Sequence, residues 1–114
     1  MSKLEQEFNE NMEVWREHCI KTAYSSIIQD YLNCEGYRNI VYMGKKALPL
    51  LRKAYDTESD DRGHRDSLRW LLVNPVKAIL GADFQIPNWM RGMIPVMAKY
   101  TAKWLDENME KYVK

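Results

Sequence analysis

Residues 35–55 read EGYRNIVYMGKKALPLLRKAY, and this stretch decides the fold class. Apolar side chains recur at helical spacing as far as Met43, and Gly44 then offers the left-handed backbone conformation that ends many helices. Pro49 lies near the first turn of the next apolar segment, where its missing N–H costs little. The stretch therefore predicts two helices that meet in a tight helical hairpin.

Two further helices are expected before this hairpin. Apolar residues spaced by three or four positions mark one buried helical face: Leu4, Phe8, Met12, Trp15 and Cys19. Thr22, Ser25 and Ser26 carry hydroxyls that compete for backbone hydrogen bonds, so a break is expected there. We expect helices over residues 3–22 and 25–33, with Ile27 and Ile28 among the buried apolar residues.

The second half of the chain also predicts helices. Residues 56–64, DTESDDRGH, contain no large apolar side chain and indicate a surface loop. We expect a helix that ends near Val73, and then a helix capped by Asn74 that runs to Gly81, with one proline-kinked helix as the alternative. Asn88 is the expected cap of a long final helix with Pro95 in its second turn.

No segment alternates as a strand does, so the chain is predicted to be all-α. We expect a compact bundle of five to seven helices that forms a single domain over residues 1–114. The residues expected to converge on its core are Trp15, Tyr37, Ile40, Leu48, Leu51, Leu72, Ile79, Met97 and Trp104.

Length and charge narrow the classes of function. A chain of 114 residues that is 46% hydrophobic can bury roughly 65% of its unfolded surface, enough for one self-supporting core. Its 17 basic and 16 acidic side chains leave a net charge of +1, so no global field attracts nucleic acid or an anionic membrane. No apolar run reaches the roughly 18 residues of a membrane span, and the acidic N-terminus differs from a signal peptide. We expect a cytoplasmic protein without membrane association.

Catalytic and metal signatures are weak. Cys19 and Cys34 have neither CxxC nor zinc-site spacing and are expected to be buried, reduced thiols. His64 with Asp66 could form an acid–base pair, but no further nucleophile or histidine lies at a useful spacing. We therefore predict no catalytic residue, no metal site and no cofactor.

Two resemblances add to this picture. The segment MGKKALPLLRKAY, residues 43–55, resembles the start of a HEAT-type helical repeat, in which a glycine turn precedes an Ala-Leu-Pro-Leu-Leu helix. Over a longer stretch the chain resembles small uncharacterised prokaryotic all-helical proteins, some of which travel with mobile elements. The positions that carry this second resemblance are Tyr37, Ile40, Val41, Met43, Gly44, Ala47, Leu48, Pro49, Trp70, Gly81, Pro87, Gly92 and Trp104. It implies a helical fold in a prokaryotic phage or mobile-element setting, and no reaction.

The most distinctive polar pattern is basic and aromatic. Arg62, Arg65 and Arg69 recur at steps of three and four, so on a helix they would share one face suited to phosphate or carboxylate. Trp70 points about 100° away from Arg69, which favours the core for its indole. The competing interpretation is a solvated face that balances the acidic loop. The candidate binding residues are Arg62, His64, Arg65, Arg69, Trp89 and Arg91.

Three functions remain open from the sequence. Seven tyrosines, four tryptophans and seven methionines exceed what a core of this size needs, and these residue types anchor protein interfaces. We therefore favour a non-enzymatic protein-interaction module, an adaptor or inhibitor that binds a larger protein. Nucleic-acid binding through the Arg62, Arg65 and Arg69 face is the alternative, with help from four further basic residues, Lys45, Lys46, Arg52 and Lys53. An enzyme that uses His64 and Asp66 has the least support. The sequence indicates neither the partner's identity nor the oligomeric state.

Overall fold

Helices make up every regular element that the structure describes. The computed structural model describes residues 2–22, 25, 27–58 and 68–112. In chain order its elements are α1 (Lys3–Lys21), α2 (Ile28–Leu32), α3 (Glu35–Met43), η1 (Gly44–Ala47), α4 (Leu48–Thr57), η2 (Arg69–Leu71), α5 (Val73–Leu80), η3 (Gly81–Asp83), η4 (Asn88–Met90), α6 (Ile94–Asn108) and η5 (Met109–Lys111), where η denotes a 3₁₀-helix. No strand occurs among these residues, so the predicted all-α class is confirmed.

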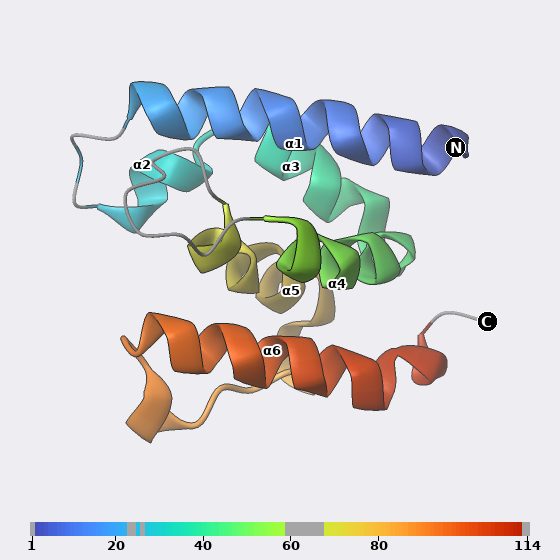
Figure 1. Ribbon diagram of the computed structural model, residues 1–114, viewed down its shortest axis with the longest axis vertical. Helices are drawn as coiled ribbons and strands as arrows, with labels where there is room; N and C mark the ends of the chain where they lie inside the picture. The colour runs from blue at the N-terminus through green and yellow to red at the C-terminus, as the bar shows by residue number, and fades with distance from the viewer. Residues whose placement is uncertain (1, 23–24, 26, 59–67, 113–114) are drawn as a thin grey trace.

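The helices form three layers (Figure 1). α1 lies on one side, α6 lies on the opposite side, and α3, α4 and α5 fill the space between them. α1 packs mainly on α3, α3 also packs on α5, and α6 contacts both α4 and α5. The Cα radius of gyration is 13.5 Å, close to the roughly 13 Å expected of a compact domain of this length.

The predicted core residues converge. Five of them are fully buried: Trp15, Ile40, Leu48, Leu51 and Leu72. The other four are partly buried and pack against the same cluster: Tyr37, Ile79, Met97 and Trp104. The hydrophobic spacing in the sequence therefore identified these nine core positions correctly.

α1 and α3 come closest at Gly36, which is buried. A Cβ atom at Gly36 would lie 2.4 Å from the carbonyl oxygen of Asn11 and 2.9 Å from the amide nitrogen of Trp15. Beside this contact the Asn39 side-chain amide donates to Asn11 at 3.1 Å. The Trp15 indole N–H donates to the carbonyl oxygen of Tyr31 at 2.9 Å, so α2 is also tied to α1.

The glycine stop and the proline start are confirmed. Gly44 ends α3 with φ at 67°, and Pro49 lies in the first turn of α4. The two helices then pack on different neighbours, because α3 contacts α1 and α5 whereas α4 contacts α6. The turn therefore joins two helices of the middle layer that pack on different neighbours, in place of a tight hairpin of two helices packed on each other.

Two helix starts differ from the prediction. Asn74 does not cap a helix: it lies inside α5, and its side-chain amide donates to the carbonyl oxygen of Leu71 at 3.1 Å. The final helix starts at Ile94 and not near Trp89, because Gly92 has a φ of 86° and Pro95 occupies the first turn of α6. The predicted stop at Gly81 is confirmed, with φ at 57°.

The polar segment after α4 is described only in part. α4 continues through Thr57, so the start of the predicted 56–64 loop is helical. Residues 59–64 lie outside the described part of the chain. The described residues just before Val73 form the 3₁₀-helix η2 and not the end of an α-helix.

Candidate functional site

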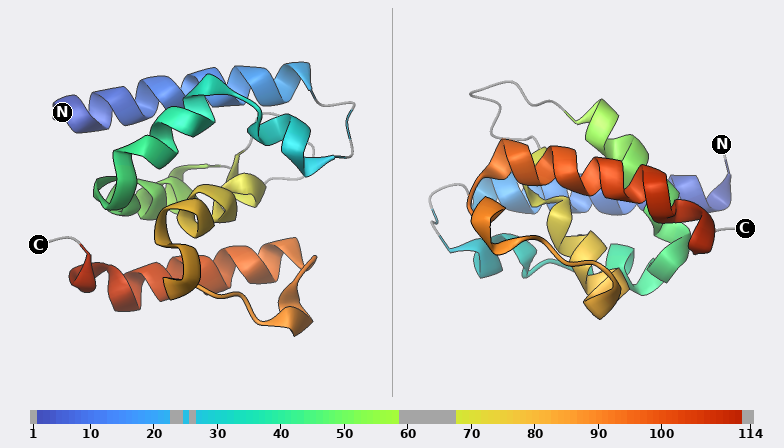
Figure 2. Two further views of the ribbon diagram at one scale, coloured as in Figure 1. Left: turned by 180° about the vertical axis from the view of Figure 1, so that it is seen from behind. Right: turned by 90° about the horizontal axis from the view of Figure 1, so that it is seen from below.

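Large apolar side chains are exposed mainly at one end of the molecule. The C-terminal end of α1, α2, and η4 with the start of α6 all lie toward this end, although α1 and α6 are on opposite sides of the molecule (Figure 1, Figure 2). Six of the eight large apolar side chains that are exposed in the described chain belong to these elements or border them: Ile20, Ile27, Ile28, Trp89, Met93 and Ile94. We call these six residues the apolar edge. Contiguous exposed apolar surface marks interaction sites, whereas single exposed apolar residues need no explanation. Ile28 and Ile94 meet this condition, because both line one groove.

A groove of about 290 Å³ opens at the apolar edge. Ile28 of α2 and Ile94 of α6 belong to its lining. The other lining residues come from η2, α5, the segment that leads into α6, and α6 itself: Trp70, Leu71, Val73, Asn74, Lys77, Ile86, Arg91, Gly92 and Met97. The walls are thus largely apolar and belong to elements far apart in the sequence.

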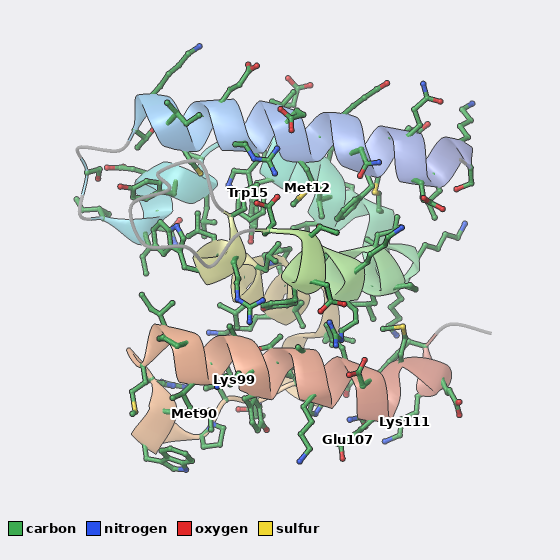
Figure 3. All side chains as sticks on the ribbon, in the orientation of Figure 1. Met12, Trp15, Met90, Lys99, Glu107 and Lys111 are labelled. Atoms are coloured by element: carbon green, nitrogen blue, oxygen red, sulfur yellow. The ribbon has the colours of Figure 1, made fainter. Side chains whose placement is uncertain are left out.

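The segment that carries Trp89 is anchored from inside. Residues 84–93, which we call the strap, connect η3 to α6. Phe84 and Met90 of the strap are buried, and Phe84 packs edge-on against Trp104 with ring centroids 5.0 Å apart. Met90 lies at the end of the molecule where α6 starts (Figure 3). Trp89 is nevertheless 69% exposed, so the fold holds the strap in place while leaving this indole in solvent.

α2 is held in a similar way. Tyr31 is buried and packs edge-to-face on Trp70 at 5.2 Å. Ile27 and Ile28 are 60% and 51% exposed, so their predicted burial is wrong. The reason is that α2 begins only at Ile28. This short helix turns Tyr31 into the core and leaves both isoleucines in solvent.

The formal charges in the groove lining are positive. Lys77 lies on α5 and Arg91 on the strap, and both are exposed. No carboxylate belongs to the groove lining, and neither cation forms an ion pair with a residue in the described ranges. Because the net charge of the whole chain is only +1, this positive character is local.

The structure separates the residues that the sequence proposed for binding. Trp89 is at the apolar edge and Arg91 lines the groove beside it. Arg69 is half-buried: its guanidinium lies 5.6 Å from the centroid of the Tyr55 ring and donates to the carbonyl oxygen of Tyr55. Arg62, His64 and Arg65 lie outside the described residues.

The sequence interpretation missed the isoleucines of the site. Ile28 and Ile94 each follow a break in helical periodicity, at Ser25 and at Gly92 respectively. A helix that begins a few residues later than expected turns a different set of side chains toward the core. The two breaks were therefore the signal in the sequence that both isoleucines could be exposed. The groove itself depends on how α2, α5 and α6 pack together, and local sequence patterns do not predict that packing.

A second hollow, of about 350 Å³, lies between α1 and α4 and has a different character. It carries charges of both signs, including Arg16, which pairs with Glu13 and with Glu58. Glu58 also accepts a hydrogen bond from the backbone N–H of Leu68 at 3.2 Å, so these charges serve the fold. This hollow is a weaker candidate for recognition than the groove.

Both cysteines belong to the hydrophobic core. Both cysteines are buried and free, as predicted. Burial, with the neighbouring Cys34 as a smaller cause, raises the pKa of the Cys19 thiol to about 12, so this thiol is a poor nucleophile near neutral pH. Among the described residues, no group of three or more His, Cys, Asp or Glu side chains could hold a metal ion.

Comparisons with known proteins place no relative beside this chain. No protein-family model matches the sequence, and no curated protein or solved structure matches it either. In the described part of the chain, no helix is both long enough and apolar enough to cross a membrane.

Proposed function

We propose that this chain is a small non-enzymatic interaction module, an adaptor or inhibitor that binds a larger protein through its apolar edge and groove. The observation that supports this function is the exposure of six large apolar residues toward one end of the molecule, two of which, Ile28 and Ile94, line a groove. The resemblance noted in the sequence adds a prokaryotic, phage or mobile-element setting to the proposal, and the sequence expectation of a cytoplasmic location is kept in it.

The packing of the strap supports a recognition role. Trp89 is exposed although Met90 beside it is buried, so the indole is presented by an anchored backbone. Binding through an anchored side chain avoids most of the ordering cost that a loose segment would add. Tryptophan is also enriched among residues whose truncation weakens protein complexes by about 2 kcal/mol or more. Trp89 is therefore the residue expected to matter most for binding.

The alternative of nucleic-acid binding has less support. It relies on Arg62 and Arg65, which lie outside the described residues, and on Arg69, which packs on Tyr55. It stays a prediction with a direct test, because phosphate contacts make binding weaken steeply with salt. Retardation of DNA or RNA that disappears as salt rises would support it.

The test is capture of partners from the native host with matched variants. Ile94→Glu places a charge at the groove, and Val14→Glu makes the same change at a side chain of similar exposure on α1, 46% against 43% for Ile94. Circular dichroism should show that both variants fold. We expect the parent and Val14→Glu to retain the same specific protein, and Ile94→Glu to lose it. A partner retained equally by all three proteins would refute the proposed binding surface.

A further inference from the structure

We propose that the groove binds an acidic amphipathic helix of the partner protein, an inference that rests on the proposed function. Such a helix would place apolar side chains between Ile28 and Ile94 and acidic side chains near Lys77 and Arg91. Neither the sequence patterns nor the comparisons name this partner chemistry.

The size of the groove favours side chains over a whole small molecule. Its volume of about 290 Å³ is at the lower limit of the roughly 300–1,000 Å³ typical of small-molecule sites. It is also continuous with exposed apolar residues, because Ile28 and Ile94 belong to both the groove and the apolar edge. A site of this form suits a few anchoring side chains that project from a larger surface.

The secondary structure around the groove favours a helix as the occupant. No strand exists among the described residues, so the groove offers no sheet edge to which an extended peptide could add. Grooves between helices commonly bind an amphipathic helix through apolar residues at positions i, i+3 or i+4, and i+7. The walls here come from α2, α5 and α6, which is the setting of that recognition mode.

The charges of the groove favour acidic side chains on the bound helix. Lys77 and Arg91 come from different elements, and no carboxylate belongs to the groove lining. An acidic residue on the bound helix would meet either cation, whereas a basic residue would be repelled by both. Two cations are few for a nucleic-acid or membrane surface, where affinity grows with the number of basic contacts.

The test is a display selection with the purified full-length chain. The probe is a library of random peptides of about 15 residues, long enough for about four helical turns. We expect the selected peptides to carry a net negative charge and to repeat apolar residues at helical spacing. Lys77→Glu and Arg91→Glu should each lower the affinity for the best peptide by about tenfold or more. Lys111→Glu should leave its affinity unchanged, because Lys111 lies at the other end of the molecule from Met90 (Figure 3).

Several results would overturn the inference while leaving the proposed function intact. These are an enrichment of neutral or basic peptides, the absence of any enriched peptide, and affinities that do not respond to Lys77→Glu or Arg91→Glu. Sedimentation that shows a dimer broken by Ile94→Glu would instead identify a second copy of this chain as the occupant. Binding of vesicles of phosphatidylcholine and phosphatidylserine, without peptide binding, would identify a lipid surface. If Ile94→Glu still captures the native partner, the proposed function itself fails.

Discussion

Replacing Gly36 with Ala tests how closely α1 and α3 pack. The new Cβ atom would be 2.4 Å from the Asn11 carbonyl oxygen, which is 1.0 Å short of the 3.4 Å at which ordinary contact begins. Both nearest atoms belong to the backbone of α1, so no side-chain rotation relieves the clash and the helix itself must move. Overpacking of this kind costs about 1–3 kcal/mol, occasionally more. The better helix propensity of Ala returns only about 0.5–1 kcal/mol.

We therefore expect Gly36→Ala to lower the free energy of unfolding by roughly 1–2 kcal/mol and the Tm by roughly 3–10 °C. Urea denaturation followed by circular dichroism measures the first quantity, and calorimetry measures the second. Arg38→Gly and Arg38→Ala, at an exposed position of the same helix, provide the control. In that pair the Ala variant should be the more stable one. If Gly36→Ala is as stable as the parent, α1 and α3 do not approach each other as described.

Three further predictions follow from buried or half-buried side chains. Leu51→Ala should lower the free energy of unfolding by about 2–5 kcal/mol because Leu51 is fully buried, and an unchanged denaturation midpoint would contradict this packing. Arg69→Glu should destabilise the fold by about 1–2 kcal/mol because it removes the contact with Tyr55, whereas a fully exposed arginine would change stability little. The pKa of the Cys19 thiol is about 12 in the folded chain against an ordinary 9.0, so unfolding releases a proton above pH 9. Stability should then fall as the pH rises from 9 toward 12 on account of this thiol, and the fall should be shallower in Cys19→Ala.

The fold was largely predictable because its signals are local. Gly44 and Gly81 end helices through backbone conformations that glycine adopts easily, and both stops are where the sequence placed them. Helix starts were less predictable. Asn74 is a residue type that often caps helices, but here it lies within α5. Its side-chain amide donates to the carbonyl oxygen of Leu71, which belongs to η2. A cap depends on the backbone before it, and that backbone was predicted to be α-helical.

The site was less predictable because it depends on packing between distant segments. Trp89 and Arg91 were identified as binding candidates from their residue types; Arg91 lines the groove, and Trp89 is exposed at the apolar edge. Arg69 was expected on an exposed face, but its guanidinium packs on the ring of Tyr55, which lies on a different helix, and donates to the Tyr55 carbonyl oxygen. Ile28 is exposed only because α2 is short, which sequence periodicity did not reveal.

The most direct measurement of the central claim is site-specific photocrosslinking in the native host. A photoreactive benzoylphenylalanine would replace Met93 in one protein and Tyr42 in another, so that Trp89 stays in place. Both positions are exposed, at 46% and 84%, but only Met93 belongs to the apolar edge. We predict a discrete crosslinked protein from position 93 and none from position 42. A partner crosslinked only from position 42, or none from position 93 while the parent chain still captures a partner, would contradict the assignment of the apolar edge as the binding surface.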